Sequence, residues 1–310
     1  MSTATLSGAS PAEQQVSPPV VVLVAPQLGE NIGAAARAML NCGWSELRLV
    51  RPRDGWPNPA AVANSAGADA VLDGALVFET TAEAIGDLTA VFATTARPRH
   101  MVKPVVDPVE AARRLNDRAI VGHRPGLLFG GERSGLDNDD VALADTVLTM
   151  PLNPDFTSLN LAQAVLVAAW SWRQQCLGLV GGPLPSGEGG QPDAGAQSGA
   201  NDSDDASPWS HSGRRDVSPA PRKAMIGLFD HLERELEHAG FFKVEAMRPS
   251  MIRNLRSLLL RASPTEQEVR TLHGVVTALS DRRKGGAPRR RQASSSKDAT
   301  VSGDGDEGEG

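Results

Sequence analysis

The chain has 310 residues, 40% of them hydrophobic, which is enough for one large core and a smaller folded unit. Its formal net charge of −6 argues against a uniformly basic surface for nucleic acid. The longest apolar runs, such as residues 20–25, are too short to cross a bilayer, and the N-terminus lacks the pattern of a secretory signal. We therefore expect a cytoplasmic protein with no membrane contact, in which Cys42 and Cys176 are reduced thiols.

The first part of the chain alternates short β-rich runs with helical patterns, after a polar segment (residues 1–18) that we expect to be a flexible arm. Strands are predicted at residues 20–25, 47–50, 90–95, 126–130 and 146–150. Helical patterns or cap signals occupy residues 31–43, 58–68, 107–117, 138–145 and 159–179, with Asn31, Asp107 and Asn138 as predicted N-caps. This alternation predicts a parallel sheet covered by helices on both faces, within a domain spanning residues 19–179.

A Gly/Pro/Ser/Asp-rich stretch at residues 180–217 cannot bury a core and is predicted to be a disordered linker. Helical periodicity returns in residues 218–284, and residues 285–310 are expected to be a disordered tail. The predicted helices run over residues 223–242, with Gly240 as the C-cap, from Arg248 or Pro249 to Leu260, and from Thr265 to Leu279. Residues 219–284 hold 12 Lys/Arg against 8 Asp/Glu, a local net charge of +4.

Four arginines of this helical module recur at helical intervals. They are Arg248, Arg253, Arg256 and Arg261. This spacing would let them follow a phosphate backbone, and an ordinary solvated helix face is the alternative interpretation.

The segment GENIGAAARAM (residues 29–39) directly follows the first predicted strand. It contains Gly29 and Gly33 but not the G-x-G-x-x-G spacing, which argues against a dinucleotide site. Arg37 lies six residues after Asn31, nearly two turns along the helix, on a roughly similar side. The alternative is an ordinary surface arginine on an amphipathic helix.

Two further polar loops stand out. FGGERSGLD (residues 129–137) is not a P-loop, but its glycines permit tight turns and close approach of a ligand. NPDFTSLNLAQAV (residues 153–165) is a loop that ends in a helix start, with Thr157 or Ser158 as the predicted N-cap and Asn160 in the first turn. For residues 129–137 the alternative is an ordinary strand-to-helix loop with a surface ion pair. For residues 153–165 it is simple helix capping.

The order of these three motifs along residues 20–175 resembles the SpoU or TrmH-like branch of the SPOUT superfamily of RNA methyltransferases. That order is N-x-G-x-x-x-R, then FG-x-E-x-x-GL, then N-P-x-x-[ST]-S-L-N-[LV]-A. The segment ATTARPR (residues 93–99) and the C-terminal helices make the TrmJ-type tRNA 2′-O-methyltransferases the most similar group.

The resemblance implies an α/β domain whose C-terminal part forms a deep trefoil knot, followed by a small all-helical module that helps to bind tRNA. It implies S-adenosylmethionine as the cofactor, no metal, and a homodimer that packs about the knot. Residues 159–179, with Trp170 and Trp172, are the expected dimer face, and burial within the monomer is the alternative. The implied reaction is 2′-O-methylation of the pyrimidine at position thirty-two of the tRNA anticodon loop.

Individual residues acquire roles through the same resemblance. The implied cofactor contacts are Thr94, Thr95, Ala96, Gly130, Met150, Thr157, Ser158 and Leu159. The implied catalytic set is Arg37 with Asn31, Glu132, Ser158 and Asn160, while Arg99 and Arg37 contact RNA. Because a guanidinium stays protonated, we expect Arg37 to position the hydroxyl and a phosphate and to stabilise alkoxide charge, rather than to act as a base.

Two alternatives remain at this point. One is a SpoU-type enzyme for a different tRNA or ribosomal RNA position. The other is an RNA-binding protein without catalysis, which the intact Asn31, Arg37, Ser158 and Asn160 argue against.

Overall fold

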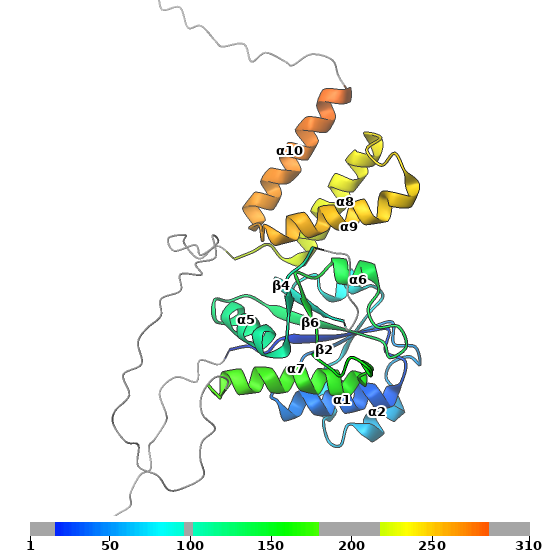
Figure 1. Cartoon of the computed structure of the whole chain (residues 1–310), viewed down its shortest axis with the longest axis vertical. Helices are drawn as coiled ribbons and strands as arrows, with labels where there is room; N and C mark the ends of the chain where they lie inside the picture. Colours follow the sequence, from blue (N-terminus) through cyan, green and yellow to red (C-terminus); the bar gives the residue numbers. More distant parts are fainter. Residues whose placement is uncertain (1–15, 96–101, 180–217, 285–310) are drawn as a thin grey trace, which may run out of the picture.

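A computed structural model of the protein describes residues 16–95, 102–179 and 218–284. Its centre is a seven-stranded, fully parallel sheet with the strand order β3-β2-β1-β6-β4-β7-β5 (Figure 1). The strands are β1 (Val20–Val24), β2 (Leu47–Val50), β3 (Leu76–Phe78), β4 (Ala90–Thr94), β5 (Val105–Val106), β6 (Pro125–Gly130) and β7 (Thr146–Leu148). The parallel sheet predicted from the sequence is therefore confirmed.

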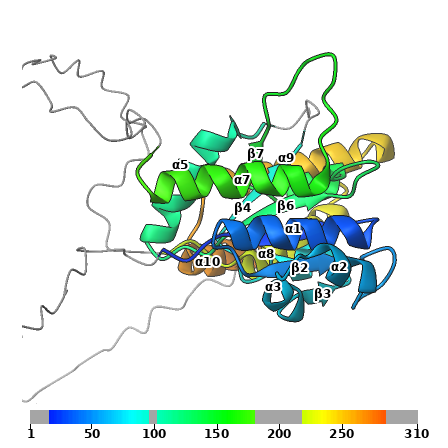
Figure 2. The same ribbon diagram turned by 90° about the horizontal axis from the view of Figure 1, so that it is seen from below.

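Helices cover both faces of this sheet (Figures 1 and 2). One face is covered by α1 (Gly29–Asn41), α3 (Asp69–Asp73), α5 (Pro108–Ile120) and α7 (Leu161–Cys176), and α2 (Pro59–Asn64) packs on α1. The other face is covered by α4 (Thr81–Ala84) and α6 (Asn138–Ala142). Alternate residues of β1 explain this arrangement: Val21 and Leu23 join the first core, while Val20 and Val22 join the second.

Two strands were not predicted, and both lie at the edges of the sheet. β3 has exposed side chains at Leu76 and Val77, and β5 is only two residues long. Strands that are this short and this exposed show no hydrophobic periodicity in the sequence. They form because a neighbouring strand offers backbone groups to pair with.

The predicted helix starts need three corrections. α1 begins at Gly29 without any side-chain cap, so Asn31 lies inside the first turn. Asp137, rather than Asn138, caps α6, because its carboxylate accepts hydrogen bonds from Asp139 N and Asp140 N. Asn160, rather than Thr157 or Ser158, caps α7. Asp107 caps α5 as predicted.

The C-terminal helices form a small module with its own core (Figure 1). They are α8 (Arg222–His238), the short 3-10 helix η1 (Glu245–Met247), α9 (Arg248–Arg261) and α10 (Glu266–Lys284). Met225, Phe229 and Leu260 are buried among them. Gly240 follows α8 with a φ of 66°, which fits the predicted C-terminal cap.

The module is joined to the sheet domain at the start of α8. Arg222 is 3% exposed, its guanidinium donates to Asp145 at 2.5 Å, and its backbone N donates to Leu88 O. Lys223 N donates to Gly86 O. A buried ion pair and two backbone hydrogen bonds therefore fix the point where the module meets the domain. The predicted arm up to residue 15, the linker up to residue 217 and the tail lie outside the described residues.

Candidate functional site

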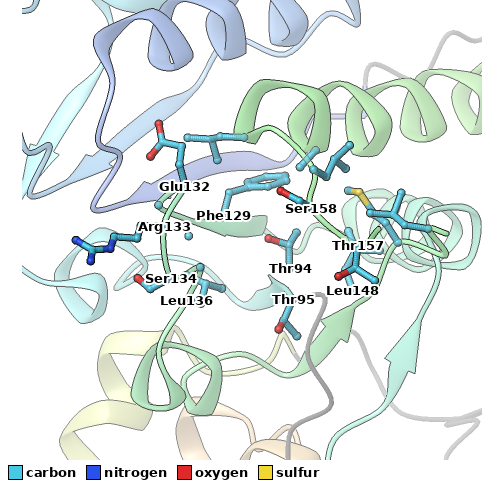
Figure 3. A pocket seen from close by; sticks show the side chains of 18 residues that line it. Thr94, Thr95, Phe129, Glu132, Arg133, Ser134, Leu136, Leu148, Thr157 and Ser158 are labelled. Carbon is cyan, nitrogen blue, oxygen red and sulfur yellow. The ribbon is translucent and has the colours of Figure 1, made fainter. Parts of the chain in front are cut away.

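A cavity of about 320 Å³ lies at the carboxyl ends of the central strands (Figure 3). Its walls come from the ends of β4, β6 and β7 and from the segment that leads into α7. The lining residues are Thr94, Thr95, Phe129, Gly130, Gly131, Glu132, Arg133, Ser134, Gly135, Leu136, Leu148, Met150, Leu152, Thr157, Ser158, Leu159, Leu161 and Ala164. Ligands of open parallel sheets bind at this edge, where the loops of neighbouring strands diverge.

A chain of hydrogen bonds connects three separate segments at the rim of the cavity. Asn31 Nδ2 donates to Glu132 Oε1 at 2.7 Å, and Asn160 Nδ2 donates to Asn31 Oδ1 at 2.9 Å. The Glu132 carboxylate also accepts from Gln27 N at 2.8 Å and from Leu28 N at 3.3 Å, just before α1 begins. A carboxylate at this position compensates the free N–H groups of a helix that has no cap of its own. These hydrogen bonds therefore fix the positions of α1, α7 and the loop after β6 relative to one another.

Asn160 also organises the start of α7. Its Oδ1 accepts from Ala162 N at 2.8 Å, and its backbone N donates to Gln163 Oε1 in a reciprocal capping box. Thr157 and Ser158 are therefore not needed as caps. Within the described residues their hydroxyls form no hydrogen bond, and both side chains line the cavity (Figure 3). They are therefore among the polar side chains of the cavity wall that are available to a ligand.

The glycines after β6 serve the protein's own backbone. A Cβ added at Gly130 would lie 2.1 Å from Leu136 N, and one added at Gly131 would lie 2.3 Å from Ala25 O. Gly135 has a φ of 67°, which disfavours other residues. The loop is therefore folded back on itself, and this close packing, rather than contact with a ligand, requires Gly130 and Gly131.

The structure brings most of the predicted cofactor residues together. Thr94, Thr95, Gly130, Met150, Thr157, Ser158 and Leu159 all line the one cavity. Ala96 and Arg99 lie outside the described residues. Sequence reasoning did not select the apolar side chains of Phe129, Leu136, Leu148 and Leu152, because a buried strand-end residue looks the same whether it borders a core or a cavity.

Arg37, like Asn31 and Asn160, is a predicted site residue that is not among the residues lining this cavity. Its side chain is exposed on α1. Of the predicted catalytic residues, Asn31, Glu132 and Asn160 meet one another, and Ser158 and Glu132 line the cavity.

The arginines of the helical module are largely committed to ion pairs. Arg248 pairs with Glu237 at 2.9 Å, Arg256 with Glu233 at 2.7 Å, and Arg253 with Asp139 of α6 at 3.3 Å. These three ion pairs join the helices to one another and to the sheet domain. The four arginines predicted to follow a phosphate backbone are therefore not all free to bind phosphate. Within the described residues, Arg261 alone of the four has no ion-pair partner.

The two tryptophans of α7 differ in their surroundings. Trp172 is 3% exposed and belongs to the core, whereas Trp170 is 57% exposed. Leu166 on the same helix is also exposed, as is Leu40 on α1, the helix that packs against α7. Trp172 is thus a core residue, and only Trp170 remains available for an interface.

Residues 18–170 match the SpoU rRNA methylase family, and residues 223–293 match the C-terminal domain of the tRNA methyltransferase TrmJ. The chain is 32% identical to a tRNA (cytidine/uridine/adenosine-2′-O-)-methyltransferase TrmJ from Pseudomonas aeruginosa, over 83% of this chain and 91% of that protein. It is also 32% identical to a tRNA (cytidine/uridine-2′-O-)-methyltransferase TrmJ from Yersinia pestis, over 84% of this chain and 90% of that protein.

The chain belongs to the SpoU methylase family, in its TrmJ branch. It is therefore an RNA methyltransferase. The crystal structure of TrmJ from Z. mobilis ZM4 has the same fold, with a TM-score of 0.69 and 42% identity over 84% of this chain and 99% of that chain. Within the described part of this SpoU enzyme, no helix could span a membrane and no group of three or more His, Cys, Asp or Glu residues is placed to hold a metal ion.

Proposed function

We propose that this SpoU enzyme transfers a methyl group from S-adenosylmethionine to a ribose 2′-hydroxyl of tRNA, at the pyrimidine in position thirty-two of the anticodon loop. The observation that carries the proposal is the cavity, where seven residues expected to contact the cofactor lie together. The names of the P. aeruginosa and Y. pestis relatives support tRNA ribose as the target, and they differ in whether adenosine is included. The position in the loop rests on the family resemblance.

The cavity fits the proposed cofactor in size and chemistry. Its volume of about 320 Å³ lies at the lower end of the range of small-molecule sites. Met150, Leu152 and Leu159 are partly exposed in the cavity and offer apolar surface to an adenine ring, while Thr157 and Ser158 offer unused hydroxyls. When bound, S-adenosylmethionine would supply a methyl group on a positively charged sulfonium sulfur. The neutral thioether that remains after transfer is a good leaving group without help from a metal.

We assign Arg37 to the substrate side of the reaction. A guanidinium does not accept the hydroxyl proton, because it stays protonated in proteins. It binds a phosphate next to the target ribose and stabilises negative charge on the 2′-oxygen as the hydroxyl proton passes to solvent water. Asn31, Glu132 and Asn160 act as positioning residues, since their polar atoms are already bound to one another.

A homodimer belongs to the same proposal, as does the deep trefoil knot. Arg37 is exposed outside the cavity of its own chain, and in this proposal a second copy brings its Arg37 to that cavity. The exposed Trp170 and Leu166 of α7, beside α1, provide an apolar surface for that contact. The strand order, with β6 between β1 and β4, returns the chain to the middle of the sheet, as a knot requires.

The proposal is tested with the purified full-length chain, S-adenosylmethionine and a tRNA transcript, by mass spectrometry of the nucleosides. We expect 2′-O-methylpyrimidine in the anticodon loop, and its loss when the nucleotide at position thirty-two carries 2′-deoxyribose. Methylation that persists on the deoxy substrate would exclude that site, and methylation of ribosomal RNA alone would favour the alternative target. Arg37→Lys should lower kcat at least tenfold, while Arg270→Lys on α10 should leave it unchanged. Near-normal turnover of Arg37→Lys would exclude a role for the planar guanidinium.

A further inference from the structure

Phe156 is the large apolar residue most exposed to solvent among those the structure describes. Its side chain is 70% exposed, on the loop between β7 and α7 that arches away from the sheet in Figure 2. It directly precedes Thr157 and Ser158, which line the cavity. Single exposed apolar residues are common on protein surfaces, but this ring lies directly beside the proposed cofactor cavity, where the substrate has to approach.

The backbone around Phe156 is held in a defined turn. Asp155 N donates to Asn153 Oδ1 at 3.0 Å, and Phe156 N donates to Asn153 O at 2.9 Å. Pro151 and Pro154 restrict the φ angles of the same segment. The ring is therefore presented by an ordered turn, so that a partner does not have to order the loop backbone first.

The other aromatic residues that the structure describes do not share this position. Phe129 forms part of the cavity wall but is 1% exposed, so its ring faces are covered. Trp170 is exposed on α7, and Phe241 is exposed in the helical module. Since aromatic residues make up only 4% of the chain, an open ring face next to the cavity is a rare feature of this surface.

The charge around Phe156 favours a base over a phosphate as its partner. Asp155 is exposed beside it, and a carboxylate repels the RNA backbone. Aromatic rings in RNA-binding sites stack on unpaired bases, and every base has a π face for this contact. We propose that Phe156 stacks on the nucleobase of the nucleotide whose ribose is methylated, and so holds that nucleotide splayed out over the cavity. This assignment rests on the proposed ribose methylation.

The test compares Phe156→Tyr and Phe156→Leu in the full-length enzyme. Tyrosine keeps the stacking face, while leucine keeps apolar bulk without it. We expect Phe156→Leu to raise the KM for tRNA at least tenfold, and Phe156→Tyr to stay within about twofold of the parent enzyme. Val121→Ala replaces an exposed apolar residue at the end of α5, away from the cavity and the module; it is the control and should have no effect. A Phe156→Leu enzyme that behaves like the parent would overturn the proposal.

Three further measurements separate this role from its competitors. The affinity for S-adenosylmethionine and the sedimentation coefficient should both be unchanged in Phe156→Leu. A weaker affinity for the cofactor would instead assign the ring to the cofactor site. A changed sedimentation coefficient would assign it to a contact between two copies. Equilibrium binding of an anticodon stem-loop without a base at the target nucleotide should be equally weak for the parent and for Phe156→Leu. If the two still differ on that RNA, Phe156 does not stack on that base. Failure of ribose methylation itself would instead appear as absence of product with the parent enzyme.

Discussion

At the scale of single residues, buried charges of this enzyme are matched by specific partners near the junction of its two parts. Lys103 is 9% exposed, and its ammonium donates to Ala142 O at 3.1 Å and to Ala144 O at 2.6 Å, at the end of α6. Carbonyl groups at a helix C-terminus suit a cation. Burial lowers the pKa of Lys103 to about 8, Asp145 opposes this change, and Arg222 and Arg261 add to it.

The stability of the folded chain should therefore depend on Lys103 at alkaline pH. Because the pKa in the unfolded chain is about 10.4, the unfolded state binds more protons than the folded state between pH 8 and 10.4, and stability rises with pH in that window. We expect the difference in unfolding free energy between the parent and Lys103→Met to grow by up to about 3 kcal/mol from pH 7.5 to 10.5. Chemical denaturation at several pH values measures it. A pH-independent difference would show that folding does not lower the pKa of Lys103.

At the scale of elements, the site is built where helices and loops meet, and its polar residues act mainly on the protein itself. α1 has no cap of its own, and Glu132 from the loop after β6 binds the backbone just before it. α7 is capped by Asn160, whose amide also reaches Asn31. One hydrogen-bonded chain therefore sets the positions of two helix starts and of one cavity wall.

The loop after β6 should not tolerate a side chain at Gly130. A Cβ there would lie 2.1 Å from the backbone of Gly135 and Leu136, so the loop must move. We expect Gly130→Ala to lower the unfolding free energy by about 1–3 kcal/mol and to weaken S-adenosylmethionine binding, as measured by thermal unfolding and calorimetric titration. Gly227→Ala on α8 is the control, since nothing lies within 4 Å of its added Cβ, and it should be neutral or slightly stabilising. Equal effects of the two substitutions would show that the loop is not closely packed.

At the scale of the whole molecule, the apolar surface of α7 beside α1 is the proposed contact between two copies. Trp170 is 57% exposed there, and Leu40 of α1 is 45% exposed. We expect Trp170→Glu to shift the sedimentation of the protein from dimer to monomer, because a charge in a buried apolar interface is costly to desolvate. Methylation activity should fall with it, since Arg37 would no longer reach a second cavity. Leu279→Glu on α10, where the side chain is 62% exposed, should leave the dimer intact. A Trp170→Glu protein that stays dimeric would place the interface elsewhere.

The sequence by itself determined the elements whose pattern is local. The five interior strand predictions agree with the sheet to within two residues at each end, because continuous apolar runs mark strands buried on both faces. The order of three polar motifs was enough to indicate the family, which the comparisons confirm. Asp107 and Gly240 were assigned correctly, since a cap depends on the residue itself and on its immediate neighbours.

Only the tertiary structure decided which polar residues meet and which cap. Thr157, Ser158 and Asn160 are all capable of capping α7, and the contact with Asn31, 129 positions earlier in the chain, favours Asn160. The same is true of Arg253, whose partner Asp139 lies on α6, so a row of arginines suited to phosphate became a set of ion pairs. A sequence motif shows which polar side chains are present. Their hydrogen-bond and ion-pair partners come from distant parts of the chain and depend on tertiary packing, which a local pattern does not contain. Arg37 is exposed and lies outside the cavity of its own chain, and we propose that it reaches the cavity of a second copy.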